Sequence, residues 1–288
     1  MFALLLVFAS SLAAQQNRFG SPACSGPDRE LADRTFFLLC HSGSLKVPVW
    51  VSYELKPEYL MGNAARPKRF RRDASLSQSG AQDSDYKGSG FVRGHMAPAE
   101  DFSWSEEAIR STFLLSNAVP QRHNPNAGRW SQLEAAVRRL AAVSDAVYVV
   151  TGPIFDSAQP EFIGPGRVAV PSHTFKAVLA VRGLKKSMYA AIIPNDAVVK
   201  GPLHSFGVTV AEVQRRTGLD FFDALEDEEE RRLESSPSRS GDLHRFQNRT
   251  RLKGEVDARH PAGSAAILDS LSNLLMGGLV SPTVHTLP

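Results

Sequence analysis

Residues Asp85–Asp101 read DYKGSGFVRGHMAPAED. They include three glycines, which permit close approach of the backbone: Gly88, Gly90 and Gly94. Arg93 and His95 lie two residues apart, so their side chains project to the same face of an extended segment. An arginine donates charge-assisted hydrogen bonds to phosphate oxygens, and a histidine with an ordinary pKa of ~6.5 accepts a proton at neutral pH. The pair favours phosphate hydrolysis, while the alternative is an Arg-x-His sequence that is incidental to a loop.

Two further motifs follow, TFLLSNAVPQ at Thr112–Gln121 and NAGRWSQLE at Asn126–Glu134. Asn126, Trp130 and Glu134 are spaced four residues apart, which places them on one face of a helix. Amide and carboxylate oxygens suit a hard ion such as Mg²⁺, which keeps most of its waters. The alternative is a structural helix, in which the tryptophan packs inward and its neighbours cap the helix or face solvent.

In this order, the motifs resemble those of the DNA/RNA non-specific endonucleases, a family of the ββα-metal group. Three more segments extend the resemblance over roughly residues 35–222: YVVTGPIF (Tyr148–Phe155), VAVPSHTFKAVL (Val168–Leu179) and IIPND (Ile192–Asp196). The resemblance implies an α+β fold with a central antiparallel sheet flanked by helices. It also implies a nuclease that hydrolyses phosphodiester bonds of DNA and RNA and leaves 5′-phosphates.

The resemblance assigns the central roles residue by residue. His95 matches the general base that activates the attacking water. Asn126 matches the protein ligand of the catalytic metal, and Glu134 matches the carboxylate that holds metal-bound water. The implied cofactor is Mg²⁺, with Mn²⁺ as a compatible substitute.

The resemblance also assigns groups to the scissile phosphate. Arg93 and Asn117 match residues that lie close to it. Arg71 matches an arginine that stabilises the charge of the transition state, with Arg69 as the competing choice. The surrounding basic segment would hold the nucleic-acid backbone without reading its sequence, through Lys68, Arg69 and Arg72.

One position departs from the family pattern. The family usually has Asp before Arg-Gly-His, where this chain has Val92. If residue 92 faces the site, an Asp there would orient Arg93 or a metal-bound water, and valine can do neither. The alternative is that Val92 packs into the core.

The composition places the chain among soluble globular proteins. It has 288 residues, 42% apolar and 22% charged, which excludes a mostly disordered chain, a collagen-like chain and a polytopic membrane protein. The 33 Lys and Arg against 30 Asp and Glu give a net charge of +3. So small a charge does not by itself indicate a nucleic-acid binder.

The N-terminus predicts export. Residues Met1–Ala14 are uncharged and mostly apolar, which is too short for a membrane span and typical of a signal-peptide core. No Lys or Arg precedes this run, so a buried strand is the alternative. In a secreted or periplasmic protein, Cys24 and Cys40 would pair and contribute ~3 kcal/mol. Otherwise they are two buried thiols.

Hydrophobic periodicity predicts the order of the elements. Strands are expected over Val47–Leu55, Ala146–Thr151 and a hairpin of Thr174–Val181 with Met188–Ile193. Helices are expected over Ser105–Phe113, Asn124–Ala142 and Thr209–Thr217, and a loop over Ser75–Gly90. The predicted domains are a signal peptide over 1–14, a nuclease domain over 15–225 and a tail over 226–288. The tail would be a weakly ordered linker, because Glu226–Glu230 is a run of acids, followed by an amphipathic helix near Ile267–Leu275.

A second class of function remains open. Val92 would also suit a non-catalytic nucleic-acid-binding protein on a decayed nuclease fold, although His95, Asn126 and Glu134 are all present. The expected partners are DNA and RNA as substrates. A homodimer is compatible with the resemblance, and no stable membrane insertion is expected.

Overall fold

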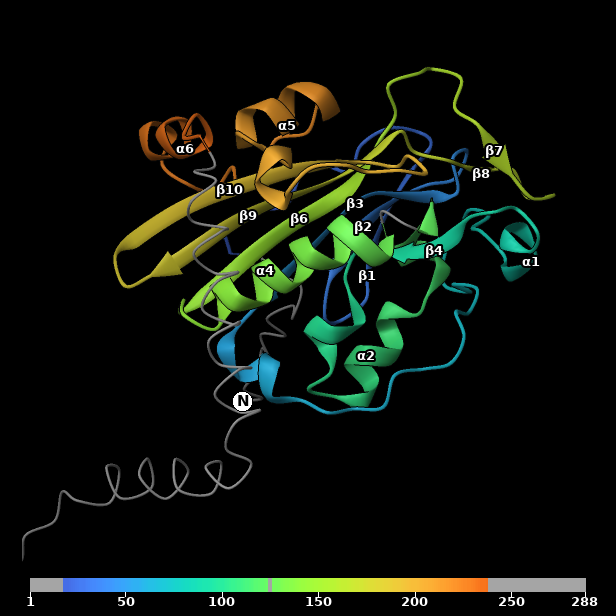
Figure 1. Cartoon of the computed structure of the whole chain (residues 1–288), viewed down its shortest axis with the longest axis horizontal. Helices are drawn as coiled ribbons and strands as arrows, with labels where there is room; N and C mark the ends of the chain where they lie inside the picture. Colours follow the sequence, from blue (N-terminus) through green and yellow to red (C-terminus); the bar gives the residue numbers. More distant parts are fainter. Residues whose placement is uncertain (1–17, 124–125, 238–288) are drawn as a thin grey trace, which may run out of the picture. The chain divides into compact units, whose positions relative to one another are not determined.

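A seven-stranded antiparallel sheet organises the chain, and the helices lie on both of its faces (Figure 1). The computed structural model describes residues 18–123 and 126–237. These residues belong to one compact unit, Met1–Leu243, whereas the second unit, His244–Pro288, lies outside the described residues. The strands, in their order across the sheet, are β1 (Arg29–Asp33), β2 (Leu38–Ser42), β3 (Val47–Leu55), β6 (Ala146–Ile154), β9 (His173–Arg182), β10 (Lys185–Pro194) and β11 (Gly207–Val208).

The central strands confirm the strands expected from the sequence. β3 has the predicted bounds, and β9 and β10 form the predicted hairpin. β6 continues to Ile154, through Gly152 and Pro153, because it pairs with β9 along its whole length. The prediction of an α+β fold with a central antiparallel sheet flanked by helices is therefore correct.

Helices α5 (Val210–Thr217) and α6 (Asp227–Glu234) cover one face of the sheet. Thr209 caps α5 by accepting from the backbone N–H of Glu212, and Gly218 ends it with φ 69°, a conformation that favours glycine. The apolar core on this face includes Phe175 and Leu179 of β9. The predicted Cys24–Cys40 disulfide is present and ties the N-terminal segment to β2.

The prediction that order is lost from Glu226 onward is wrong for the first part of that segment, which forms α6. Glu226 accepts hydrogen bonds from the first backbone N–H groups of the helix, where a negative charge is favourable. Leu233 is buried in the core, and Lys186 pairs with Glu229 at 2.6 Å. The acidic run is thus the start of a docked helix. The expected helix near Ile267–Leu275 and the apolar segment Met1–Ala14 lie outside the described residues.

Helix α4 (Ser131–Ala141) lies on the other face of the sheet, together with α2 (Glu106–Thr112) and a two-stranded ribbon of β4 (Val92–His95) and β5 (Ala118–Gln121). Ser105 caps α2, and the helix expected over Ser105–Phe113 is confirmed. A π-helical turn, Asn126–Trp130, leads into α4.

Short elements complete the described chain. They are η2 (Pro57–Met61), α1 (Asp83–Tyr86), η3 (Ala99–Phe102), η4 (Leu115–Asn117), β7 (Phe162–Ile163), β8 (Val168–Ala169) and η6 (Leu203–Phe206). α1 lies within the segment that was expected to be a loop throughout. Over residues 18–123 and 126–237, none of the helices has the length and apolar character needed to cross a membrane.

Candidate active site

Strand β4 places His95 and Arg93 on one face of the ribbon. His95 pairs with Ala118 of β5 and Arg93 with Pro120, so the two side chains share a face by strand alternation. Gly94 faces the other way, and a Cβ atom there would lie 1.9 Å from Oε1 of Gln121. Only glycine allows this close approach, which explains its place between the two functional candidates.

His95 packs against two aromatic rings, which also contact each other, and is only 7% exposed. Its ring centroid lies 4.5 Å from that of Phe70 and 4.8 Å from that of Phe113. Trp130 donates from Nε1 to the carbonyl oxygen of His95 at 3.2 Å, which fixes the end of the strand. Nε2 of His95 is buried and has no hydrogen-bond partner within the described chain. Burial, and then the charge of Arg66, lower the pKa of His95 to about 3, so the ring is neutral at pH 7.

Asn117 is fully buried, and its amide bonds to the backbone around His95 rather than facing a cleft. Nδ2 donates to the carbonyl oxygens of Ala97 and Thr112, each at 2.9 Å. Oδ1 accepts from the N–H of Ala97 at 2.9 Å. An amide carries two donor hydrogens, so Asn117 has none left for a phosphate. What this side chain holds in place is the segment that follows His95.

A buried lysine on the central sheet, Lys176, was not singled out in the sequence. It is 1% exposed, and its Nζ donates to the carbonyl oxygen of Met96 at 3.1 Å. Nζ also lies 4.6 Å from the ring centroid of Trp130. Burial lowers the pKa of Lys176 and raises that of Glu134, while the opposite charges of the two groups act against both shifts. A lysine within the mostly apolar run TFKAVLAV of β9 was the only sign of it in the sequence.

A second charged pair joins α4 to η3, with the Asp101 side chain fully buried and that of Arg138 24% exposed. Arg138 donates to Oδ1 of Asp101 at 2.9 Å, and the hydroxyl of Tyr53 donates to Oδ2, also at 2.9 Å. Burial raises the pKa of Asp101, and the neighbouring charge of Arg138 opposes this. Together with Lys176 and Glu134, the cluster contains two acids and two bases, so its formal charge is zero. This balance allows three ionisable groups to be buried together, with Arg138 partly exposed beside them.

Arg93 is held by α1. Its Nη2 lies 2.6 Å from Oδ1 of Asp83, and its guanidinium lies 4.8 Å from the ring centroid of Tyr86. Val92 pairs with Gln121 and therefore lies on the face opposite to Arg93. The interpretation in which residue 92 faces the site does not fit this register. A carboxylate does reach the arginine, but it comes from α1.

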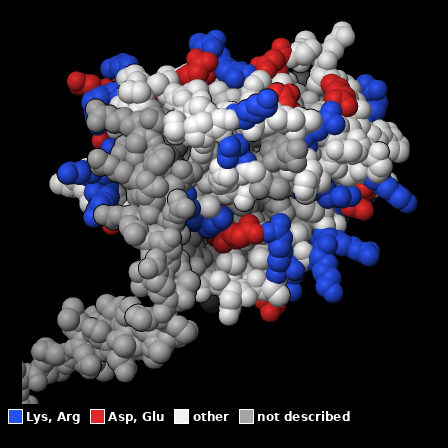
Figure 2. Space-filling model, in the orientation of Figure 1, with Lys and Arg blue, Asp and Glu red and all other residues white. Residues whose placement is uncertain are grey.

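The basic segment runs beside the histidine. Phe70 contacts His95, and the backbone of Arg71 bonds to Phe113 and Leu115 at 2.8 and 2.9 Å. Arg69 and Arg71 therefore both flank the residue that covers His95. The exposed basic side chains of this segment are Arg66, Lys68, Arg69, Arg71 and Arg72. Figure 2 shows Lys and Arg side chains gathered at the lower right of the visible face, with few acids among them.

The metal ligands that the sequence predicts come from the turn that enters α4. Asn126 opens the π-helical turn, so the segment before α4 is not the regular α-helix that was expected, and its side chain lies outside the described residues. π-turns inside helices frequently occur at functional sites. Glu134 is a buried carboxylate whose pKa burial raises, and a cation beside it would favour its ionised form. Carboxylate and amide oxygens are the ligands that Mg²⁺ takes, so these residues fit the ion.

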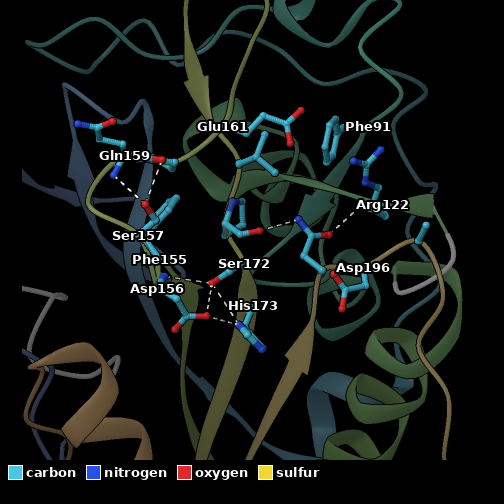
Figure 3. A pocket seen from close by; sticks show the side chains of 15 residues that line it. Phe91, Arg122, Phe155, Asp156, Ser157, Gln159, Glu161, Ser172, His173 and Asp196 are labelled. Atoms are coloured by element: carbon cyan, nitrogen blue, oxygen red, sulfur yellow. Dashed lines mark hydrogen bonds and ion pairs between the residues drawn. The ribbon is translucent and has the colours of Figure 1, made fainter.

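A separate pocket of about 400 Å³ lies beyond the other end of the ribbon (Figure 3). Phe91 and Arg122 line one side, with the guanidinium 4.1 Å from the ring centroid. Asp156, Ser172 and His173 form a hydrogen-bonded group on another side. The sequence did not indicate this pocket, because its lining comes from loops that are far apart in the chain.

Comparisons with known proteins identify the family of the chain. The family model described as DNA/RNA non-specific endonuclease matches residues 15–228. The chain is 35% identical to the mitochondrial nuclease EXOG of Danio rerio over 232 residues, which are 75% of this chain and 67% of that protein. It is also 35% identical to mitochondrial endonuclease G of Homo sapiens over 217 residues, 71% of this chain and 72% of that protein.

A solved structure gives the same result. A chain from a crystal structure of the EndoG/EndoGI complex is 32% identical, with a TM-score of 0.69, and the match covers 76% of this chain and 95% of that chain. The residues that the family model matches, 15–228, contain the sheet, the β4–β5 ribbon and α4. The chain therefore belongs to the DNA/RNA non-specific endonuclease family.

Proposed function

We propose that the chain hydrolyses phosphodiester bonds in both DNA and RNA, with His95 as general base and Mg²⁺ as cofactor, and that it leaves 5′-phosphates. The observation that carries the proposal is the neutral ring of His95, which packs against two aromatic rings and whose Nε2 has no partner within the described residues. A general base must be unprotonated before it accepts a proton from water, and this ring is neutral at pH 7.

The residues around His95 position it. Asn117 and Lys176 bond to Ala97 and Met96, which directly follow the histidine. Phe70 and Phe113 restrict the ring, so that little freedom is lost when a water lies in line with the phosphate. An anionic phosphate beside His95 would also stabilise the imidazolium that forms and so raise its pKa during the reaction.

Charge on the phosphate would be met by arginines and by the metal. Arg93 would donate to the scissile group, with Arg71 or Arg69 offsetting the charge of the transition state. Asn126 would hold Mg²⁺ and Glu134 would hold its bound water, and the ion would supply Lewis-acid chemistry at the phosphate. Lys68, Arg69 and Arg72 are exposed and would hold the backbone of either nucleic acid, because none of these groups reads a base.

We also propose that the protein is exported. The apolar run Met1–Ala14 and the Cys24–Cys40 disulfide support this, since disulfides persist in oxidising compartments. The N-terminal sequence of protein recovered from the medium or periplasm tests it. A homodimer stays a prediction, and light scattering of the purified protein measures it.

The decisive experiment compares His95→Ala with His204→Ala, a histidine exposed on η6. Each protein is incubated with plasmid DNA and with RNA, with Mg²⁺ and with EDTA. Loss of the general base should lower the rate by ~10²–10⁴-fold, whereas the control should cleave normally. Cleavage by His95→Ala near the wild-type rate would contradict the mechanism. Binding without cleavage by the wild-type protein would support the decayed, non-catalytic alternative instead.

A second comparison tests the metal assignment. Asn126→Ala should raise the Mg²⁺ concentration at half-maximal rate far more than Asn117→Ala, because only Asn126 is assigned to the metal. Equal shifts in the two variants would refute the assignment. Mapping the ends of a labelled product decides whether the phosphate stays on the 5′ side.

A further inference from the structure

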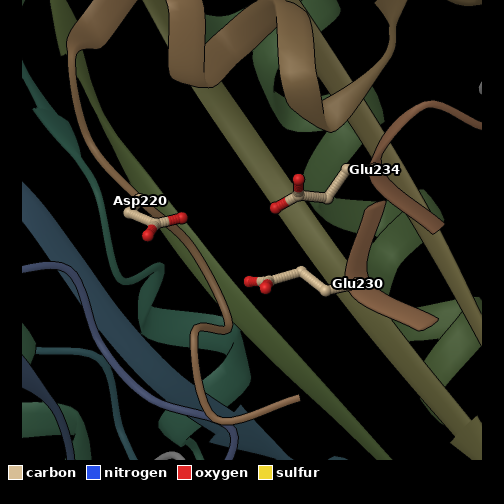
Figure 4. Close-up of side chains that lie close together, drawn as sticks. All are labelled: Asp220, Glu230 and Glu234. Carbon is tan, nitrogen blue, oxygen red and sulfur yellow. The ribbon is translucent and has the colours of Figure 1, made fainter. Parts of the chain in front are cut away.

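Three carboxylates converge far from His95 in the sequence, between α6 and the segment that follows α5. Glu230 and Glu234 are four residues apart on α6 and share one face of the helix. Asp220 follows α5 and faces them. Figure 4 shows the three carboxyl groups pointing toward one another. One oxygen from each lies within 4.8 Å of the others.

Two of these oxygens are buried without a partner. Glu234 is only 9% exposed, and its Oε1 accepts no hydrogen bond and does not reach solvent. Oε1 of Glu230 is also buried and accepts no hydrogen bond. Gln214 donates to the carboxylate of Glu234, which leaves Oε1 unsatisfied. A buried acceptor without a partner is destabilising, and the cost is larger for a charged group.

Neighbouring negative charges make it more costly still to keep Glu230 and Glu234 ionised. Burial and the charges of Glu230 and Asp220 raise the pKa of Glu234 to about 7. Burial and three neighbouring aspartates raise the pKa of Glu230, and only the charge of Arg231 opposes them. Elsewhere on α6 the structure does provide a counter-ion, since Glu229 pairs with Lys186 at 2.6 Å. The convergent carboxylates have no such base against them within the described chain.

We propose that Asp220, Glu230 and Glu234 bind a divalent cation, Ca²⁺, at a structural site that is separate from the nuclease site. All the ligands are carboxylate oxygens, which suit a hard cation, and the exposed side of Asp220 leaves room for waters. Oxygens bound to one Ca²⁺ lie at most about 5 Å apart, whereas those on one Mg²⁺ lie at most about 4.2 Å apart. One oxygen of each carboxylate lies within 4.8 Å of the other two, a span that a single Ca²⁺ can bridge. The ion would join α6 to the segment after α5.

The test measures the melting temperature of the full-length protein, stripped with EGTA and dialysed, at pH 8, where the carboxylates are ionised. Titration with Ca²⁺ should raise it saturably, by about 5–10 °C at 100 times the dissociation constant. Glu234→Gln and Glu230→Gln should abolish this rise. Glu228→Gln, an exposed position on the same helix, should retain it. Mg²⁺ should give a smaller rise at the same concentration.

Neither glutamine variant should be less stable than the wild type without Ca²⁺, because each removes a repelling charge. Folding of the variants therefore does not limit the experiment. The proposal fails if the wild-type protein shows no saturable shift. It also fails if the shift persists in Glu234→Gln, which would place the ion elsewhere, for example beside Glu134. Because the readout is stability, the result does not depend on nuclease activity.

Discussion

Replacing Asn117 with alanine separates a positioning role from contact with the substrate. The change removes three hydrogen bonds of 2.9 Å, two to Ala97 and one to the carbonyl of Thr112. A hydrogen bond contributes about 1 kcal/mol net, and a buried partner left unsatisfied costs about 1–3 kcal/mol. The expected loss of unfolding free energy is therefore about 3–5 kcal/mol. The turnover number kcat should also fall, because Ala97 lies two residues after His95.

Asn195 provides a matched control. It too is a buried amide with three backbone bonds, donating to Pro120 and Pro171 at 3.0 and 2.9 Å and accepting from Arg122 at 2.8 Å. These partners lie away from the segment that follows His95. Asn195→Ala should therefore lose similar stability with a smaller loss of kcat. Circular dichroism during urea unfolding measures the loss of stability. Cleavage of a fluorescent oligonucleotide, at a temperature well below the unfolding transition, measures kcat.

The positioning role predicts that the Mg²⁺ midpoint of Asn117→Ala stays at the wild-type value. A variant that keeps its stability within about 1 kcal/mol but loses activity would refute the reasoning, because the amide would then act on the substrate. Similar losses of kcat in Asn117→Ala and Asn195→Ala would also refute it, since the effect would then follow from general destabilisation.

Three further predictions concern His41, residue 92 and Asp83. Burial lowers the pKa of His41 to about 4, and the unfolded chain takes up its proton from pH 6.5 downward, so acid favours unfolding. The wild-type protein should lose about 2 kcal/mol more than His41→Leu between pH 8 and pH 5 in urea titrations, and equal losses would contradict this. Val92→Asp should lower the melting temperature without raising the cleavage rate, because its carboxylate would face the buried, unpartnered Oε1 of Gln121. A variant that is equally stable and cleaves faster would show instead that residue 92 faces the site. Asp83→Asn should lower kcat/KM less than tenfold, since the Asp83 side chain is 71% exposed, and high salt should reduce the difference from wild type.

The sheet could be predicted wherever a strand carries its own signal. β3, β6, β9 and β10 are rich in apolar, β-branched and aromatic residues, and each was expected from its sequence. α6 could not be predicted, because its acidic run has the composition of a solvated linker. It folds because Leu233 and the Lys186–Glu229 pair attach it to a sheet that the local sequence does not reveal.

The site was predictable to the extent that it depends on spacing along one element. The two-residue spacing of Arg93 and His95 indicated a shared strand face, and the register of β4 and β5 gives that face. Lys176 and Asp101 could not be found in the same way. They matter because they are buried next to groups distant in sequence, Trp130 and Arg138, and burial depends on the whole fold.

The partner of Arg93 shows what local sequence comparison leaves out. A motif comparison at residue 92 finds a missing carboxylate, and a decayed site follows naturally from that comparison. In the folded chain, residue 92 faces away from the arginine, and Asp83 of α1 contacts it at 2.6 Å. Asp83 lies ten residues before Arg93, and because its side chain is exposed, a phosphate can replace its carboxylate on the arginine. A guanidinium held this way is oriented before substrate arrives and can still release its carboxylate, so valine at 92 is compatible with an active nuclease.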